Sequence, residues 1–213
     1  MLDVVGTTDT INATYFTGSN GQVANPVEPG LPLEIRNVSG PGTLALRGAG
    51  FRSGTYTDRP DLLPLTGAAT TELRGVHPPF ISNVYYPIQP WRINTLGALN
   101  GGATRLVVIP AQYQSSSTNA SIGTFRTFGN MQFRLYYSDN IASYADGSTP
   151  ALAAAPSIVK VTSTVNGDNA SLRVTIVGNP AAGVQEAWVT FTALTGPYAG
   201  QWQSIDLTRS ADD

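Results

Sequence analysis

The feature of this sequence that most limits its fold is an alternation of apolar and polar residues with a period of two. The clearest example is "MQFRLYY", in which Met131, Phe133 and Leu135 alternate with more polar neighbours. The alternation recurs along the chain, and no window places apolar residues at i, i+3, i+4 and i+7 among helix-forming residues. Successive side chains of a β-strand point to opposite faces, so this pattern is typical of half-buried strands. We predict an all-β fold.

The composition favours a folded domain over a disordered chain. Hydrophobic residues make up 41% of the 213 residues, and nine Tyr, seven Phe and three Trp are available for a core. Disordered chains combine low hydrophobicity with high net charge, whereas the formal net charge here is −2. The 22 Gly and 15 Pro separate the alternating runs, as the turns of β-sandwiches and barrels require.

Charge and cysteine content exclude several classes of function. Twelve basic and fourteen acidic residues leave no basic surface for nucleic acid, so we expect no nucleic-acid partner. The absence of Cys excludes disulfides, thiolate catalysis and Cys-ligated zinc. No run of about 18 apolar residues is present, so we expect no membrane span.

Changes in composition divide the chain into three parts. Residues 1–145 are predicted to form a β-sandwich domain. Residues 146–157, "DGSTPALAAAPS", are small and contain Pro, which is typical of a linker. Residues 158–213 resume the alternation, and we predict four strands there, at 158–165, 171–177, 184–193 and 201–208. The stretch "NGDN" at 166–169 is predicted to be the turn of a hairpin between the first two.

One stretch of the first part is rich in both Pro and aromatic residues, "GVHPPFISNVYYPIQPWRINTLGALNGG" at 75–102. Its four prolines remove backbone donors and exclude long central strands. Its apolar content nevertheless stays high. We expect extended segments that pack across a sheet face or edge, with an exposed aromatic patch as one alternative.

The four strands predicted for residues 158–213 are too few for a closed immunoglobulin-like sandwich, which needs about seven strands over about 100 residues. Trp188 fits the position where such sandwiches place a core aromatic. We therefore expect an Ig-like half-domain that is either truncated or completed by strands of the first domain, of a partner chain or of another copy. Its last strand would offer an edge for strand addition at Trp202, Ile205 and Leu207.

This second part also carries a family resemblance. The stretch "PALAAAPSIVKVTSTVNGDNASLRVTIVGNPAAGVQEAWVTFTALTGPYAGQWQSIDLT" resembles the junction into tandem Ig-like or fibronectin type III-like β-sandwich modules of large secreted bacterial surface proteins. The likeness extends loosely to "LRGAGFRSGTY" and "MQFRLYYSDN" upstream. It implies an extracellular or cell-surface location and a structural or adhesive role. It transfers no active-site residue.

Aromatic side chains in and near the Pro-rich stretch are the main candidates for ligand binding. These are Tyr85, Tyr86, Trp91 and Tyr113. Sugar rings stack on exposed aromatic faces, which makes glycans a candidate partner. The other interpretation is that these rings cover a sheet edge or dock a neighbouring domain.

Asx-rich stretches are the candidates for a metal site. "SDNIASYADGS" contains Asp139, Asn140 and Asp146, and "NGDN" contains Asp168. Calcium takes several oxygen ligands from a flexible loop. Neither stretch has EF-hand spacing, and Asx side chains also form backbone hydrogen bonds in turns. We expect no cofactor, with Ca²⁺ as the alternative.

Candidates for catalysis are few. His77 is the only histidine and would be the base for Ser82 in Ser-His chemistry, but no G-x-S-x-G elbow is present. The four glutamates lie in no recognisable glycosidase motif. We therefore predict no enzymatic activity.

The sequence thus predicts a non-enzymatic extracellular module with a structural or adhesive role in a larger protein. Its expected partners are other domains of that protein or copies of itself joined by strand addition. A carbohydrate-binding module and a self-assembling fibre or capsid-like subunit are the alternatives.

Overall fold

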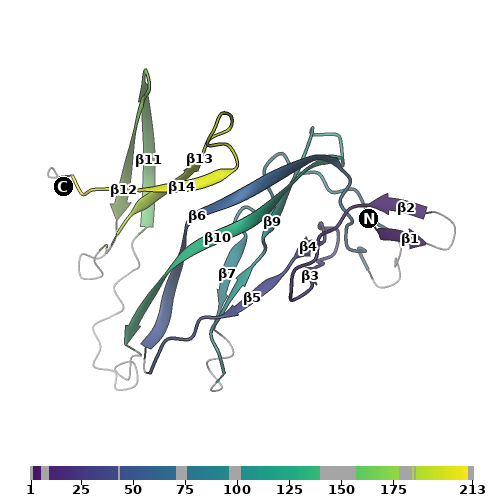
Figure 1. Cartoon of the computed structure of the whole chain (residues 1–213), viewed down its shortest axis with the longest axis horizontal. Helices are drawn as coiled ribbons and strands as arrows, with labels where there is room; N and C mark the ends of the chain where they lie inside the picture. Colours follow the sequence, from purple (N-terminus) through teal and green to yellow (C-terminus); the bar gives the residue numbers. More distant parts are fainter. Residues whose placement is uncertain are drawn as a thin grey trace. The chain divides into compact units, whose positions relative to one another are not determined.

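The computed structural model describes residues 2–5, 10–42, 44–70, 76–95, 102–139, 157–177, 184 and 186–210 (Figure 1). Every regular element among them is a β-strand, which confirms the predicted all-β class. None of these residues belongs to a helix that is long and apolar enough to cross a membrane.

The strands are numbered in chain order, as in Figure 1. Their bounds are β1 (Leu2–Val5), β2 (Thr10–Ala13), β3 (Gln22–Val23), β4 (Leu31–Pro32), β5 (Glu34–Asn37), β6 (Leu44–Leu62), β7 (Trp91–Asn94), β8 (Arg105–Val108), β9 (Ala111–Ser115), β10 (Gly123–Asp139), β11 (Ser157–Asn166), β12 (Asn169–Val177), β13 (Trp188–Thr192) and β14 (Gln201–Asp206).

The chain divides into two compact units. The first comprises Met1–Asp139 with Thr190–Ser204, and the second comprises Asn140–Val189 with Ile205–Asp213. Most of the predicted linker, residues 146–156, lies outside the described residues. Most of β13 and β14 belongs to the first unit, whereas the sequence predicted these strands as part of a domain at 158–213. The reason is that β14 pairs antiparallel with β6, placing Gln201 opposite Thr55 and Trp202 opposite Gly54.

The first unit is built on a five-stranded sheet in the order β13-β14-β6-β10-β9. Its two long strands, β6 and β10, pair antiparallel along most of their length and curve through the unit in Figure 1. The pairing register shifts four times, for example between Gly123 and Phe125 and between Phe128 and Asn130. Such irregularities increase the local twist of a strand pair, which suits strands of this length.

A second sheet, in the order β5-β8-β7, packs against the first. Its central strand β8 is the compact apolar run "RLVV", and Leu106, Val107 and Val108 are all buried. Trp91 of β7 contacts Phe51 of β6, with ring centroids 5.7 Å apart, and Phe133 of β10 at 5.6 Å. Side chains therefore join the two layers, as in a β-sandwich.

A cluster of Leu31, Ala111, Tyr113 and Phe125 forms the most deeply buried part of the core, where β9 pairs with β10 in the five-stranded sheet. The rings of Tyr113 and Phe125 lie 5.1 Å apart, and Phe16 meets Phe125 edge-on at 5.2 Å. Five half-buried side chains pack around this cluster: Phe16, Leu62, Phe80, Tyr86 and Ile109. Phe80 and Tyr86 belong to the Pro-rich stretch.

The regular part of the second unit is the hairpin β11–β12. Asn166 pairs with Asn169, so Gly167 and Asp168 form the turn. Gly167 adopts a φ of 59°, which glycine reaches without strain at the first central position of a two-residue hairpin turn. This confirms the hairpin predicted from "NGDN".

Candidate functional site

A polar cluster in the described part of the first unit is centred on Arg126. It lies directly opposite Asp58 in the pairing of β10 with β6. Its Nε donates to Asp58 Oδ1 and one terminal nitrogen donates to Oδ2, both at 2.8 Å. The Arg126 side chain is 8% exposed, against 37% for Asp58. This is a two-point ion pair whose cation is almost fully withdrawn from water.

Two aromatic rings complete the surroundings of Arg126. The guanidinium carbon lies 3.8 Å from the ring centroid of Tyr56 and 4.0 Å from that of Tyr85. Two rings cannot share one face at these distances, so the guanidinium is held between them. Tyr85 also donates its hydroxyl to Asp58 Oδ2 at 3.3 Å, and Tyr56 forms a 3.0 Å hydrogen bond with Thr192 of β13.

The surroundings keep Arg126 and Tyr85 in their protonated forms. Burial alone lowers the pKa of Arg126, but the hydrogen bond to Asp58 and the nearby tyrosine and Asp58 oxygens outweigh it, and the net shift is upward. Burial raises the pKa of Tyr85, with Arg126 opposing the shift and Asp58 adding to it. The cluster therefore holds a permanent cation and a neutral phenol. Neither is poised to exchange a proton near neutral pH.

The Pro-rich stretch binds along β9, a terminal strand of the five-stranded sheet. Tyr86 and Tyr113 exchange two backbone hydrogen bonds of 2.8 Å. Ser82 accepts from the backbone N–H of Ser115 at 2.9 Å, and Gln112 donates through its side chain to the carbonyl of Pro87 at 2.8 Å. The sequence left two positions open for these extended segments, across a sheet face or at an edge, and residues 82–87 lie at the edge. Proline prevents this segment from becoming a further long strand.

Two of the four candidate aromatics are core residues. Tyr113 is 0% exposed and donates its hydroxyl to the carbonyl of Ser121, so no ring face is open to a ligand. Trp91 is half-buried in the contact between the two layers. One side of Trp91 lines a shallow hollow of about 270 Å³, together with Pro87, Gln89, Arg92, Val107 and Ile109.

The other two candidates are half-buried in the Pro-rich stretch. One face of Tyr85 is covered by Arg126. Tyr86 contacts Phe80, with ring centroids 5.0 Å apart, and burial together with a hydrogen bond to Glu28 raises its pKa. The four rings thus serve the interior and the covered edge of the sheet. They do not form a common platform.

No group of three or more His, Cys, Asp or Glu side chains that could hold a metal occurs within the residues that the structure describes. Asn140 and Asp146 lie outside those residues, and the Asp139 side chain is likewise not described. Asp168 lies in the hairpin turn beside Gly167. The calcium alternative therefore stays a prediction.

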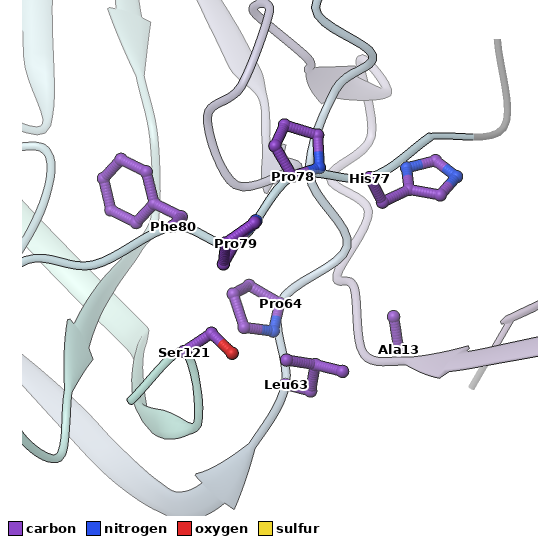
Figure 2. Close-up of a pocket in the computed structure, with 8 residues that line it drawn as sticks. All are labelled: Ala13, Leu63, Pro64, His77, Pro78, Pro79, Phe80 and Ser121. Carbon is purple, nitrogen blue, oxygen red and sulfur yellow. The ribbon is translucent and has the colours of Figure 1, made fainter. Parts of the chain in front are cut away.

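His77 lines a cavity of about 170 Å³ between the Pro-rich stretch and residues 63–64 (Figure 2). Its Nδ1 donates to the carbonyl of Thr66 at 2.6 Å, and its buried Nε2 has no hydrogen-bond partner. Figure 2 shows the imidazole and Ser121 on opposite sides of Pro64. The remaining lining is Ala13, Leu63, Pro64, Pro78, Pro79 and Phe80. Ser82, the nucleophile considered above, bonds instead to Val84 and Ser115.

The three residues expected at a strand-addition edge lie on or just after β14, which has β13 on one side and β6 on the other. Trp202 is half-buried, with its ring 6.2 Å from Phe51 and 6.4 Å from Tyr56. Ile205 is 57% exposed, and Leu207 donates its backbone N–H to Ala187. β13 is the terminal strand on this side of the sheet.

Among the described strands, the three most exposed apolar side chains belong to the hairpin β11–β12. They are Val165 at 73%, Ile158 at 66% and Val161 at 58%, and Leu172 of the same hairpin is 40% exposed. Soluble domains normally bury β-branched residues of this kind, and a contiguous exposed group marks an interaction surface. This hairpin is the second candidate site. The sequence predicted its strands but not their exposure.

The Arg126–Asp58 pair was not predicted from the sequence. The available signal was weak, because "TFRTF" places an arginine between two phenylalanines on a strand, and nothing local identifies its partner 68 positions away.

Comparison with known proteins does not assign the chain. No protein-family model, curated protein or solved structure matches it.

Proposed function

We propose that this chain is a non-enzymatic structural or adhesive module of a larger secreted or cell-surface protein, acting through the faces and edges of its sheets. The observation that carries the proposal is the β11–β12 hairpin, which presents an apolar surface to solvent. The extracellular setting rests on the resemblance of residues 150–208 alone.

The contacts of Arg126 support a structural role for this side chain. Arg126 directs one edge of its guanidinium at Asp58 and has a tyrosine ring over each face. A substrate-binding arginine needs an open fork or an open face. The cluster instead ties β6, β10 and the Pro-rich stretch together.

Carbohydrate binding is the second candidate, and the hollow beside Trp91 is the observation that favours it. Gln89 and Arg92 supply polar groups next to an indole, which is the combination that sugar sites use. The indole is only partly open, because Phe51 and Phe133 cover part of it. A structural role therefore has the stronger support.

Surface display tests the proposal. Cells that display the full chain on a tether are expected to clump or to retain one another, whereas cells with the empty tether stay dispersed. The same displayed chain is then probed with a glycan array, using Trp91→Ala and, as matched control in the same segment, the 81% exposed Ile88→Ala. Dispersed cells together with glycan binding that Trp91→Ala alone abolishes would replace the structural role with carbohydrate binding.

A further inference from the structure

Two Asn-Gly steps lie within the described residues, at Asn20–Gly21 and at Asn166–Gly167, and both asparagines are exposed. Asparagine is a chemically labile residue. Its side-chain amide carbon can be attacked by the next backbone nitrogen, and a glycine in that next position has no Cβ to hinder the approach. Exposure does not distinguish the two steps, so the difference between them depends on how the reacting atoms are held.

The Asn20–Gly21 step is held in place by hydrogen bonds. The side-chain oxygen of Asn20 accepts from the backbone N–H of Ile35 on β5 at 2.8 Å. The Gly21 N–H donates to the carbonyl of Gly18 at 3.1 Å. The nitrogen that would attack and the amide that it would attack are thus engaged with different partners. Both bonds must break before the two atoms can meet.

The Asn166–Gly167 step has no such restraint within the part of the chain that the structure describes. Neither the Gly167 N–H nor the Asn166 side chain makes a hydrogen bond there. A Cβ added to Gly167 would meet nothing within 4 Å, so the space beside this glycine is open. Asn166 pairs with Asn169, which is the last pair before the turn. The end pair of a two-stranded hairpin opens readily, and its opening frees the Asn166 backbone to rotate.

We propose that Asn166 is a site of spontaneous modification, at which the Gly167 nitrogen closes a succinimide ring on the Asn166 side chain. The Gly167 nitrogen gives its proton to a base from the solvent and bonds to Asn166 Cγ. The Cγ–Nδ2 bond breaks, and the amide nitrogen takes up a proton and leaves as ammonia. Water then adds to one of the two ring carbonyls and opens the ring to aspartate or isoaspartate. No atom is oxidised or reduced, and water is the only co-reactant.

Both products change the tip of the β11–β12 hairpin. A neutral amide becomes a carboxylate, so the formal net charge of −2 becomes one unit more negative, and the new charge lies close in sequence to Asp168. Isoaspartate also adds one carbon to the main chain, which disrupts the closing pair of Asn166 with Asn169. The modified fraction therefore records the age of the chain. This inference does not depend on the proposed structural role.

Peptide mapping of the full folded chain after incubation at mildly alkaline pH tests the inference. Trypsin places Asn166 in the peptide 161–173, where Asn169 is an internal reference because alanine follows it. In the folded chain, Asn166 is expected to react about 10-fold faster than Asn20 or more, because two hydrogen bonds add to the barrier at Asn20. A folded chain in which Asn166 reacts no faster than Asn20 overturns the inference.

The same chain unfolded in guanidinium chloride is the matched control. Both steps lose their folded contacts there, so Asn20 and Asn166 should react at similar rates. A ratio of the two rates that is equal in the folded and unfolded chains also overturns the inference, because sequence alone would then explain the difference. Asn166→Gln should abolish the reaction in the peptide 161–173 and leave the rate at Asn20 unchanged. A third step, Asn100–Gly101, lies outside the described residues and falls in a separate peptide.

Discussion

Arg126 and Asp58 lie directly opposite each other on β10 and β6 and form an ion pair with two contacts of 2.8 Å. Tyr85, which stacks on the same guanidinium, belongs to the Pro-rich stretch. One arginine thus fastens an irregular segment to the long strand pair. The guanidinium is nearly unexposed, so the loss of any of these contacts would leave a buried charge without a partner and destabilise the fold.

Replacement of Arg126 by Lys is expected to lower the free energy of unfolding by about 1–3 kcal/mol. Lysine cannot make the two-point contact and stacks less well on tyrosine. Because Asp58 is partly exposed, the loss should stay below that of a fully buried broken pair. Urea denaturation measures it. The control is Arg36→Lys in the exposed pair with Glu34, with an expected change below about 0.5 kcal/mol. Equal losses in the two variants would contradict a structural role for Arg126.

Gly123→Ala is expected to destabilise the sheet by about 1–3 kcal/mol, because a Cβ at this position would overlap the carbonyl oxygen of Gln114 on β9. Gly48→Ala on β6 is the matched control. Its nearest neighbour would be Tyr136 Cδ2 at 3.7 Å, an ordinary contact, so the change should be neutral or stabilise by up to about 1 kcal/mol. Thermal unfolding compares the two. A Gly123→Ala variant as stable as Gly48→Ala would refute the close approach of β9 and β10.

The pairing of Glu34 with Ser19 predicts a loss of stability in acid. The Ser19 hydroxyl and backbone N–H both donate to the carboxylate, and these bonds, with Arg36, lower the pKa of Glu34 below 4.5. The unfolded chain takes up this proton first, so the contribution is present above about pH 4.5 and disappears as the pH falls through the folded pKa.

Denaturation at several acidic pH values checks this expectation. Glu34→Gln should reduce the decrease in the free energy of unfolding that occurs as the pH falls below about 4.5. Ser19→Ala should reduce it as well, and the double variant should add nothing further, because both changes remove the same interaction. An unchanged decrease in Glu34→Gln would show that other carboxyl groups cause it.

Tyr86 predicts the opposite dependence, at alkaline pH. Burial first, and then Glu28, raises its pKa above the ordinary 10.0. The folded chain keeps the proton longer than the unfolded chain, so this stability is present below about pH 10 and decreases as the pH rises toward the folded pKa. Tyr86→Phe should reduce the loss measured between about pH 8 and about pH 11. The exposed Tyr198→Phe is the control. A loss that is the same in both variants would contradict the prediction.

The local sequence was sufficient to predict the two strands of the β11–β12 hairpin. The alternation of residues 158–165 and 171–177 and the turn at "NGDN" predicted β11 and β12 closely, because alternation and turn chemistry are both properties of neighbouring residues. The same holds for the all-β class. Four prolines likewise indicated that the stretch around Tyr85 would not form a long central strand.

What the aromatic side chains do could not be predicted in the same way. Tyr85, Tyr86, Trp91 and Tyr113 look alike in sequence, yet Tyr113 is in the deepest core, Trp91 joins two layers and Tyr85 covers an arginine. Ring exposure depends on which strand lies opposite, and no local pattern contains that information.

The sequence by itself determined that this chain forms strands, where many of them turn, and which side chains share a face. Only the tertiary structure decided the neighbours: β14 beside β6, nearly 150 residues earlier, and Arg126 opposite Asp58. The physical reason is that a period of two orients side chains along one strand, whereas strand partners are chosen by long-range packing and hydrogen bonding among many strands of similar pattern.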